Sequence, residues 1–451
     1  MKYEKWSIGY WLLKEYIRFA DWLIHKKIII RGKEHIPHHK PLVFAPNHQN
    51  ALSDPMAVLL NTKYQPVWLA RADIFGKSKI TDFILKFLKI MPVYRLRDGK
   101  ENLEKNEQTF EHSIRVLEND FALALFPEAA HSGKRQMLAH KKAVPRIVFM
   151  AEERTGNQLD IQIVPTGIYY SHYWKFNRTV IVHFGKPIPV KDFLQAYDRN
   201  PSAAFIDLKN RIRESILPLV IDIQSKTFYE EFESIRTIYG RYYLKQQHKR
   251  TTHLNRFYSD QKLVRKLDEL EARDPKAAKD LADLARNYSR SIEQHHLRPW
   301  LISRRKKHLP PAILSTILLL VTLPVFLYGF LLNAIPFFLI DKVVRQKVKD
   351  PTFWSTFFLI GGIVLFPLFY LIELFAVAWL LPGAWAWLIF LISLPFAGKL
   401  AFQWYRVFRK TQGRYRILRL KWFKPNVYQH LLQEKGHLFR MLNRWIHQHK
   451  V

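Results

Sequence analysis

The chain has 451 residues, more than one compact core usually holds, so two or more domains are expected. It contains no cysteine, which excludes disulfides, a thiol nucleophile and zinc held by thiolates. Its 71 lysines and arginines against 38 aspartates and glutamates give a net charge of +33. Such an excess indicates an anionic partner: nucleic acid, a phosphorylated small molecule or a lipid surface. The aromatic content of 14%, with 13 tryptophans, favours the lipid surface.

Residues 1–26 predict an amphipathic helix. Their apolar residues recur at helical spacing, with lysine and arginine between them, and no small-residue cleavage site of a secretory signal follows. Such a helix either lies on a membrane surface or packs against the domain that follows it.

Residues 27–190 alternate between strand-like and helical segments, which predicts an α/β domain with a mostly central β-sheet flanked by helices. Residues 191–308 are charged, poor in glycine and helical in pattern, and Pro275 is expected to separate two helices there. The strand-like runs of the first region are residues 27–31, 41–45, 65–70, 91–95, 121–126, 161–170 and 179–185, and two of its helical segments are 101–118 and 140–153.

Residues 309–403 are expected to hold C-terminal membrane helices. Residues 311–340 carry no charge, and 351–398 carry a single one, Glu373. The second stretch is long enough for two spans, so it predicts a helical hairpin of residues 351–380 and 384–402. The first stretch is too short for two full spans. It is therefore either a re-entrant pair, broken near Pro324–Gly329 and Pro336, or one tilted span.

The flanks of these segments predict the topology. Residues 298–308, 341–350 and 399–421 are basic, and basic flanks stay on the cytoplasmic side of a membrane. The chain is therefore expected to be an integral membrane protein, with its α/β domain on the cytoplasmic face and residues 404–451 as a basic cytoplasmic tail.

The stretch "NHQNALSDP", residues 47–55, places His48 and Asp54 six positions apart. On an ideal helix these side chains would point about 120° apart, so they pair only if His48 lies in a loop and Asp54 begins a helix. Pro55 supports this arrangement, because proline suits the first helical position and aspartate suits the N-cap before it. A capping aspartate can still offer its second oxygen to an imidazole.

Three further motifs follow in the same region. One has arginines after a strand, the next ends a buried strand in Phe-Pro-Glu, and the last is a strand with Val-Pro in it. Together with the histidine–aspartate block, these four ordered blocks over residues 27–190 resemble the glycerolipid acyltransferase family, which acylates glycerol phosphate and lysophosphatidic acid. The residues of the three motifs are Arg95 and Arg97, Phe126-Pro127-Glu128, and Val164-Pro165.

Two positions depart from the commoner family pattern. The family usually has four residues between histidine and aspartate, and here Ser53 occupies that register while Asp54 follows. The five-residue gap resembles fungal-type glycerol-3-phosphate and dihydroxyacetone-phosphate acyltransferases and related bacterial proteins, which also carry C-terminal hydrophobic segments. The glycine of the family's Phe-Pro-Glu-Gly block is Ala129 here.

The resemblance implies roles for these residues. His48 would act as general base on the acceptor hydroxyl, oriented by Asp54, and a histidine suits that task near neutral pH. Arg95 would bind the acceptor phosphate, because a guanidinium fits phosphate with two hydrogen bonds. Glu128, with Pro127 beside it, would bind the acceptor hydroxyls. Supporting candidates for the phosphate are Arg97, Lys134, Arg135, Lys141 and Lys142.

The expected activity is transfer of a fatty acyl chain from a thioester, either acyl-CoA or acylated carrier protein, to glycerol 3-phosphate, with no metal or cofactor. The alternative within the class is acylation of 1-acylglycerol-3-phosphate to phosphatidic acid. A basic membrane scaffold or a nucleic-acid binder is the non-enzymatic alternative. Because the basic residues crowd against membrane segments and no nucleic-acid module is recognisable, anionic membrane lipids rather than nucleic acid are the expected macromolecular partner.

Overall fold

The computed structural model describes residues 3–94, 101–303 and 307–448. The chain divides into two compact units. The first comprises Met1–Ile221 and Val344–Ile360, and the second comprises Asp222–Val343 and Gly361–Val451.

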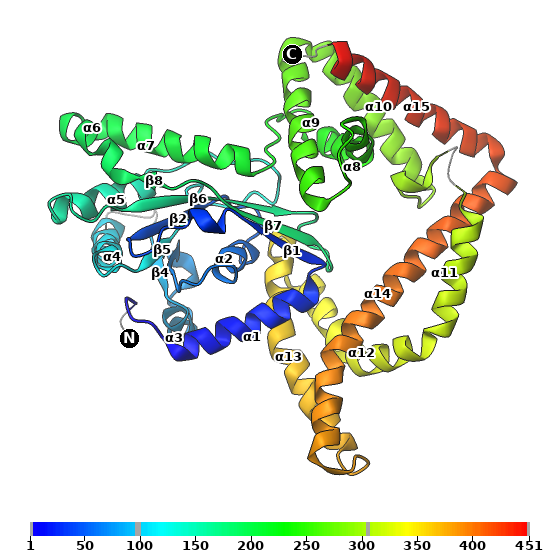
Figure 1. The fold of residues 1–451 in the computed structure, drawn as a ribbon, viewed down its shortest axis with the longest axis horizontal. Coiled ribbons are helices and arrows are strands. Elements are labelled where there is room, and N and C mark those ends of the chain that lie inside the picture. Colours follow the sequence, from blue (N-terminus) through cyan, green and yellow to red (C-terminus); the bar gives the residue numbers. More distant parts are fainter. Residues whose placement is uncertain (1–2, 95–100, 304–306, 449–451) are drawn as a thin grey trace. The chain divides into compact units, whose positions relative to one another are not determined.

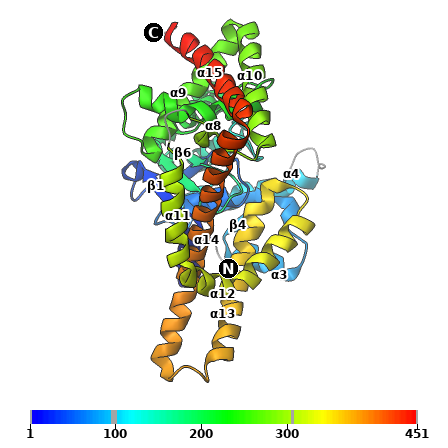
Figure 2. The same ribbon diagram turned by 90° about the vertical axis from the view of Figure 1, so that its right-hand side faces the viewer.

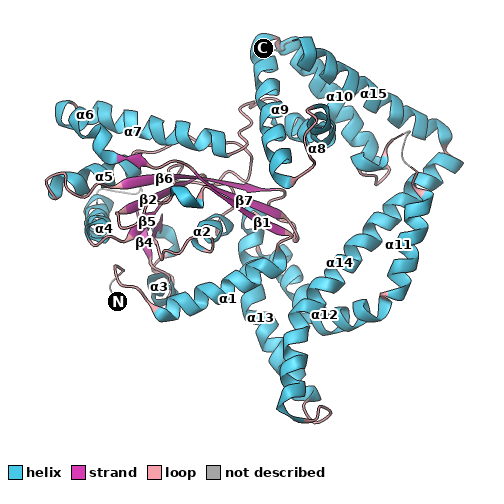
Figure 3. Ribbon diagram, in the orientation of Figure 1, coloured by secondary structure: helices cyan, strands magenta, loops and turns pink. Residues whose placement is uncertain are grey.

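The described part of the first unit is built on one eight-stranded sheet (Figures 1 and 3). Seven strands lie in the order β1-β7-β6-β2-β5-β3-β4, and β8 pairs with β6. Neighbouring strands are parallel except where β6 meets β7 and β8. This confirms the predicted α/β fold. The strands are β1 (Lys27–Arg31), β2 (Leu42–Pro46), β3 (Val67–Arg71), β4 (Ile90–Val93), β5 (Ala122–Ala124), β6 (Gln162–Tyr170), β7 (Thr179–Phe184) and β8 (Ile188–Pro189).

Helices cover both faces of the sheet. Successive side chains of a strand point to opposite faces, and because the strands are apolar on both faces, each face must be buried. In β2, Val43 belongs to one buried cluster, together with apolar residues of α4, α5 and α7. Leu42 and Phe44 belong to the other cluster, with residues of α1 and α2. These helices are α1 (Ile8–Ile24), α2 (Ser53–Leu59), α4 (Glu101–Glu118), α5 (Ala143–Arg154) and α7 (Pro201–Ile216), and α3 (Lys79–Phe87) and α6 (Leu194–Arg199) complete the set.

The predicted domain boundary at residue 190 falls inside the first unit. Helix α7 lies beyond that boundary, yet its buried face is part of the core under the sheet. The sequence pattern predicts a charged helical region for this segment because the outer face of α7 is rich in charged residues. The buried apolar stripe consists of Ala204, Leu208, Ile212 and Ile216.

The N-terminal helix α1 packs on the domain and also presents an apolar outer face. Tyr10, Lys14 and Ile17 are buried against the domain. Ile8 and Leu12 are exposed on the opposite side of the helix. The structure therefore confirms that this helix packs against the domain, and its exposed apolar face has the composition of a membrane-surface helix.

The second unit is helical. Figure 2 shows α15 running beside α10, and α11 beside α14. Helix α9 ends at Arg273 and α10 begins at Pro275, which confirms that this proline separates two helices. The helices are α8 (Tyr229–Gln246), α9 (His253–Arg273), α10 (Pro275–Gln294), α11 (Leu309–Val321), α14 (Gly383–Phe423) and α15 (Pro425–Gln448).

Three helical stretches of the described chain are long and apolar enough to cross a membrane, namely Leu323–Lys347, Pro351–Val377 and Gly383–Phe423. The first is α12 (Leu323–Lys347), and the second contains α13 (Trp354–Val377). The expected break in residues 311–340 lies at Thr322, between α11 and α12, rather than at Pro324–Gly329 or Pro336. Pro324 falls in the first turn of α12, where a proline is tolerated. Pro336 lies inside α12, as prolines do in apolar helices whose neighbours satisfy the released carbonyl.

Candidate active site

The pairing of three parallel strands brings the catalytic candidates together. Phe44 of β2 lies opposite Ala124 of β5 and Val164 of β6. Four residues further along each strand direction stand His48, Glu128 and Ile168. His48 and Glu128 lie just beyond the ends of β2 and β5, and Ile168 lies inside β6. Because parallel strands end at the same edge of a sheet, residues just beyond their carboxyl ends gather there.

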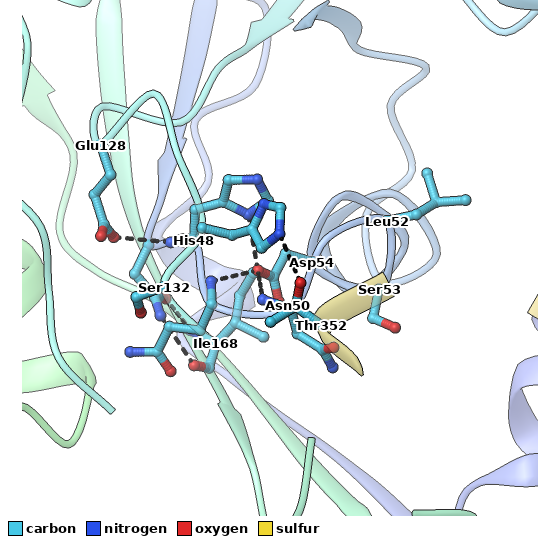
Figure 4. A network of polar contacts seen from close by, with 12 residues as sticks. His48, Asn50, Leu52, Ser53, Asp54, Glu128, Ser132, Ile168 and Thr352 are labelled. Atoms are coloured by element: carbon cyan, nitrogen blue, oxygen red, sulfur yellow. Dashed lines mark hydrogen bonds and ion pairs between the residues drawn. The ribbon is translucent and has the colours of Figure 1, made fainter. Parts of the chain in front are cut away.

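His48 and Asp54 form a direct pair (Figure 4). The distance between His48 Nδ1 and Asp54 Oδ2 is 2.9 Å, and the carboxylate is buried. The same oxygen accepts the backbone N–H groups of Gln49 and Asn50, each at 2.7 Å. Because the carboxylate accepts at Nδ1, that nitrogen carries the proton of the neutral ring, and the lone pair lies on Nε2. The arrangement is that of an imidazole oriented for general-base work.

Asp54 is not the N-cap of α2. The helix begins at Ser53 with Leu52 at the cap, so Asp54 lies in its first turn. Its carboxylate turns back over the preceding loop, because two backbone amides and the imidazole there provide three donors to a single oxygen. These donors outweigh the helix amides that a capping aspartate would satisfy.

Glu128 clamps the loop that carries His48 (Figure 4). Its Oε1 accepts the backbone N–H of His48 at 2.8 Å, and its Oε2 accepts that of Leu138 at 2.7 Å. The residue is 2% exposed, so it is not the charge of a solvated loop. The next residue, Ala129, has φ 57°. The backbone therefore keeps the left-handed turn that glycine adopts most easily, although alanine stands there.

Aromatic rings surround the His48 imidazole. The Phe126 ring stacks on it with centroids 3.8 Å apart, and His131 meets it edge-on at 5.3 Å. His131 Nε2 lies 3.1 Å from the hydroxyl of Thr352. Burial, followed by the neighbouring His48, lowers the pKa of His131. His131 is therefore a neutral neighbour of His48 at physiological pH.

The start of α13 reaches the same loop, which the sequence did not reveal. The Leu52 backbone N–H donates to Thr356 Oγ1 at 3.1 Å. Ser355 Oγ donates to Asn50 Oδ1 at 2.8 Å, and Ser53 Oγ donates to Ser355 Oγ at 3.1 Å. The available signal was a group of hydroxyl residues, Thr352, Ser355 and Thr356, at the beginning of an otherwise apolar run.

The loop is also fixed to β6. Asn47 Oδ1 accepts the Ile168 N–H at 2.7 Å, and Asn47 Nδ2 donates to the Ile168 carbonyl at 3.3 Å. Tyr173 donates its hydroxyl to Gln49 Oε1 at 2.5 Å. The loop that carries His48 is thus held by β6, by the Glu128 loop and by α13.

The cationic candidates are divided. Arg95 and Arg97 lie outside the described residues. Lys134, Lys141 and Lys142 are exposed at the surface. Their exposed positions alone do not place these lysines beside His48, Asp54 or Glu128.

Two other candidates are buried. Arg135 is 3% exposed, and it donates to the Tyr170 carbonyl at 2.8 Å while its guanidinium lies over the Tyr169 ring. These contacts tie Arg135 to β6. Pro127 is also buried, and its carbonyl accepts the N–H of Lys141 at 2.7 Å.

Comparison with known proteins agrees with this geometry. Residues 27–169 match the family model described as Acyltransferase. The chain is 23% identical over 257 residues to glycerol-3-phosphate O-acyltransferase 1 of Saccharomyces cerevisiae, and the match covers 55% of this chain. This chain spans 32% of the length of that yeast protein.

A solved structure is also similar. It is the 1-acyl-sn-glycerophosphate acyltransferase PlsC of Thermotoga maritima, at 18% identity and a TM-score of 0.33, covering 46% of this chain and 78% of that one. The family match encloses the strand ends that carry His48, Asp54 and Glu128. Residues 27–169 are thus an acyltransferase domain, and both matches support the glycerolipid acyltransferase family that the sequence motifs indicated.

Proposed function

We propose that this protein transfers a fatty acyl chain from a thioester donor to the hydroxyl of glycerol 3-phosphate in phospholipid biosynthesis. The observation that carries the proposal is the His48–Asp54 pair, 2.9 Å apart, at the carboxyl edge of the sheet. Among the described residues, no hydrogen bond to His48 Nε2 is found, so this nitrogen can accept a proton from a substrate. The similarity to a yeast protein named glycerol-3-phosphate O-acyltransferase supports the choice of acceptor.

The reaction needs a base because an alcohol is a weak nucleophile near neutral pH. His48 Nε2 takes the hydroxyl proton as the acceptor oxygen attacks the thioester carbonyl, and Asp54 stabilises the imidazolium that forms. The new C–O bond is retained when the C–S bond breaks, and the leaving sulfur receives the proton from His48. General-base assistance of this kind is worth roughly 10²–10⁴ in rate.

Arg95 is the first candidate for the acceptor phosphate, by its position in the family pattern. Glu128 is the candidate for the acceptor hydroxyls, and its carboxylate also bonds the His48 backbone. A role for Glu128 in the acceptor site therefore includes fixing the loop from which His48 acts. The acyl donor is a thioester of coenzyme A or of a carrier protein.

We also propose that the α/β domain lies on the cytoplasmic face of a membrane. Thr356 and Ser355 bond the catalytic loop, so the start of α13 is on the same side as that domain. The described residues from 222 to 303 contain no candidate span, which supports placing the basic flank 298–308 on that side as well. The chain must then return between 309 and 350. This supports a re-entrant arrangement of α11 and α12 over a single span, although α12 alone is long enough to cross.

The test uses the purified full chain in detergent or vesicles with a labelled acyl donor. Glycerol 3-phosphate and 1-acylglycerol-3-phosphate are supplied separately, and we expect label in lysophosphatidic acid from the first. Label only in phosphatidic acid from the second acceptor would assign the later acylation step instead.

The assignment of the base is tested with His48→Ala, which should lose at least 10²-fold in turnover while folding and membrane association stay intact. His112→Ala, at an exposed position of α4, is the matched control. A His48→Ala protein that keeps more than about a tenth of wild-type turnover would sink the assignment.

A further inference from the structure

Arg178, directly before β7, is a buried cation. The residue is 6% exposed. Its Nε donates to His25 Nε2 at 3.0 Å, one terminal nitrogen donates to Ser53 Oγ at 3.0 Å, and the other donates to the Tyr173 carbonyl. The guanidinium also lies over the Tyr170 ring, 4.4 Å from its centroid. Within the part of the chain that the structure describes, no carboxylate forms an ion pair with it.

Burying a charge without an ion pair is costly, so the surroundings must favour this cation through longer-range contacts. Burial lowers the pKa of Arg178, and the negative charges of Asp21 and Asp54 act in the opposite direction. Asp54, the partner of the candidate base, is therefore one of the charges that Arg178 balances.

The Asp54 carboxylate needs such a charge. Its Oδ2 accepts three hydrogen bonds, from His48, Gln49 and Asn50. Its Oδ1 is buried, and no described residue satisfies it with a hydrogen bond. The Tyr170 hydroxyl is likewise buried without a hydrogen bond of good geometry, and burial, followed by the charge of Asp54 and a side-chain interaction with the same carboxylate, raises the pKa of Tyr170. Tyr170 therefore links the uncompensated side of Asp54 to the guanidinium that covers its ring.

Ser53 provides the second connection between Arg178 and the base. It occupies the extra position in the five-residue gap between His48 and Asp54. Its hydroxyl accepts from Arg178 and donates to Ser355, so it is fixed from two sides. Asp54 follows directly, and its direction depends on where Ser53 is held.

We propose that Arg178 is a positioning residue for the His48–Asp54 pair. It fixes the register of the loop through Ser53, and its charge makes the pair harder to protonate, which keeps His48 available as a base near neutral pH. The proposal rests on the proposed role of His48 in acyl transfer. Arg178 touches no reacting atom, and it acts through Asp54.

The test follows the protonation of His48 directly. Site-resolved labelling of the full chain with diethyl pyrocarbonate, read by peptide mass spectrometry across pH, gives the titration of His48 without any need for activity. The groups that face His48 are Asp54, His131 and the backbone-bonded Glu128. Those that face Arg178 are His25, Asp21, Tyr170, Tyr173 and Asp54.

In Arg178→Met the midpoint of the His48 titration should move to higher pH by about half a unit or more, because a nearby cation has been removed from the pair. We expect kcat to fall about tenfold or more, with acceptor KM within about twofold of wild type. Arg178→Lys keeps the charge and should retain the wild-type midpoint. Arg146→Met is the control, because Arg146 is an exposed arginine of α5 whose guanidinium also lies over an aromatic ring, that of Phe110 on α4.

An unchanged His48 midpoint in folded Arg178→Met overturns the proposal, and so does an Arg178→Lys protein that titrates like Arg178→Met. If Arg178→Met does not fold, Tyr170→Phe decides, since loss of the hydroxyl near Asp54 should also raise the midpoint. A normal midpoint in Tyr170→Phe then counts against the proposal. A His48→Ala protein that remains active, together with the expected midpoint shift in Arg178→Met, would have a separate meaning. The general-base role of His48 would then fail, and the electrostatic link between Arg178 and the pair would stand.

Discussion

The backbone N–H of His48 donates to the carboxylate of Glu128 at 2.8 Å, although the two residues are eighty positions apart in the chain. Both follow parallel strands that are paired in register, and a second Glu128 oxygen bonds Leu138. A single buried carboxylate thus joins two loops of the site. Glu128 thus fixes the backbone of His48, the proposed general base.

Glu128→Gln should lower both stability and turnover. A glutamine side chain has one acceptor oxygen, so the N–H of either His48 or Leu138 loses its partner inside the domain. Leaving a buried donor unsatisfied costs about 1–3 kcal/mol. Thermal unfolding and turnover of the purified variant measure the two effects. Glu214→Gln, on the exposed side of α7, is the control, and equal behaviour of the two variants would contradict the clamp.

The double variant Ser355→Ala with Thr356→Val should lower kcat severalfold without affecting membrane insertion. It removes the hydroxyls that bond Asn50, Ser53 and the Leu52 amide. Each hydrogen bond to the loop contributes about 0.5–1.5 kcal/mol. Thr316→Val, in α11 of the second unit, serves as a control for loss of a membrane-segment hydroxyl. Wild-type turnover in the double variant would show that α13 does not position the loop.

Arg95→Ala should raise the apparent KM for the phosphorylated acceptor far more than that for the acyl donor. Loss of a hydrogen bond to a charged group costs roughly 1.5–3 kcal/mol, which is about ten- to a hundredfold in KM. Initial rates with each substrate varied in turn provide the measurement. An equal effect on both substrates would remove Arg95 from the phosphate site.

Cysteine labelling tests the topology, since the chain has no cysteine of its own. An impermeant thiol reagent added to intact cells should modify Ala384→Cys and spare Gln346→Cys. Residues 381–385 connect the two helices of the predicted hairpin and are expected on the far side of the membrane. Ala384 is the test position there rather than Gly383, because Gly383 has φ 83° and a side chain at that position would be strained. The expected pattern follows from basic flanks staying in the cytoplasm. Labelling of Gln346→Cys would instead mean that 311–340 crosses the membrane once.

The sheet could be predicted from the sequence because its strands are short apolar runs separated by helices. β1 matches its expected bounds, Lys27–Arg31. The two-residue β8 was missed, since a strand of that length has no pattern of its own. Asp54 was wrongly predicted as the N-cap of α2. Its carboxylate instead accepts three hydrogen bonds from the preceding loop, and the spacing of residues in the sequence does not reveal these donors.

The site was predictable only as far as residues near strand ends. His48 and Glu128 were found because their motifs resemble blocks of the glycerolipid acyltransferase family, and the structure shows that both follow parallel strands that end at one edge of the sheet. Arg178, Ser355 and Thr356 were not found, because their partners lie more than a hundred residues away in the chain. Such contacts depend on tertiary packing, and the hydroxyl residues that open the apolar run at 351 do not by themselves identify their partners.

The bonds from Ser355 and Thr356 to the loop at Asn50–Ser53 set an order of events during synthesis. A ribosome produces the α/β domain long before it reaches these two hydroxyls, and α11 and α12 emerge in between. The loop beside His48 therefore acquires its last partners after the first apolar helices have left the ribosome. A nascent chain that has not yet reached Ser355 lacks these bonds, so the geometry beside His48 is completed only after the first apolar helices have been synthesised.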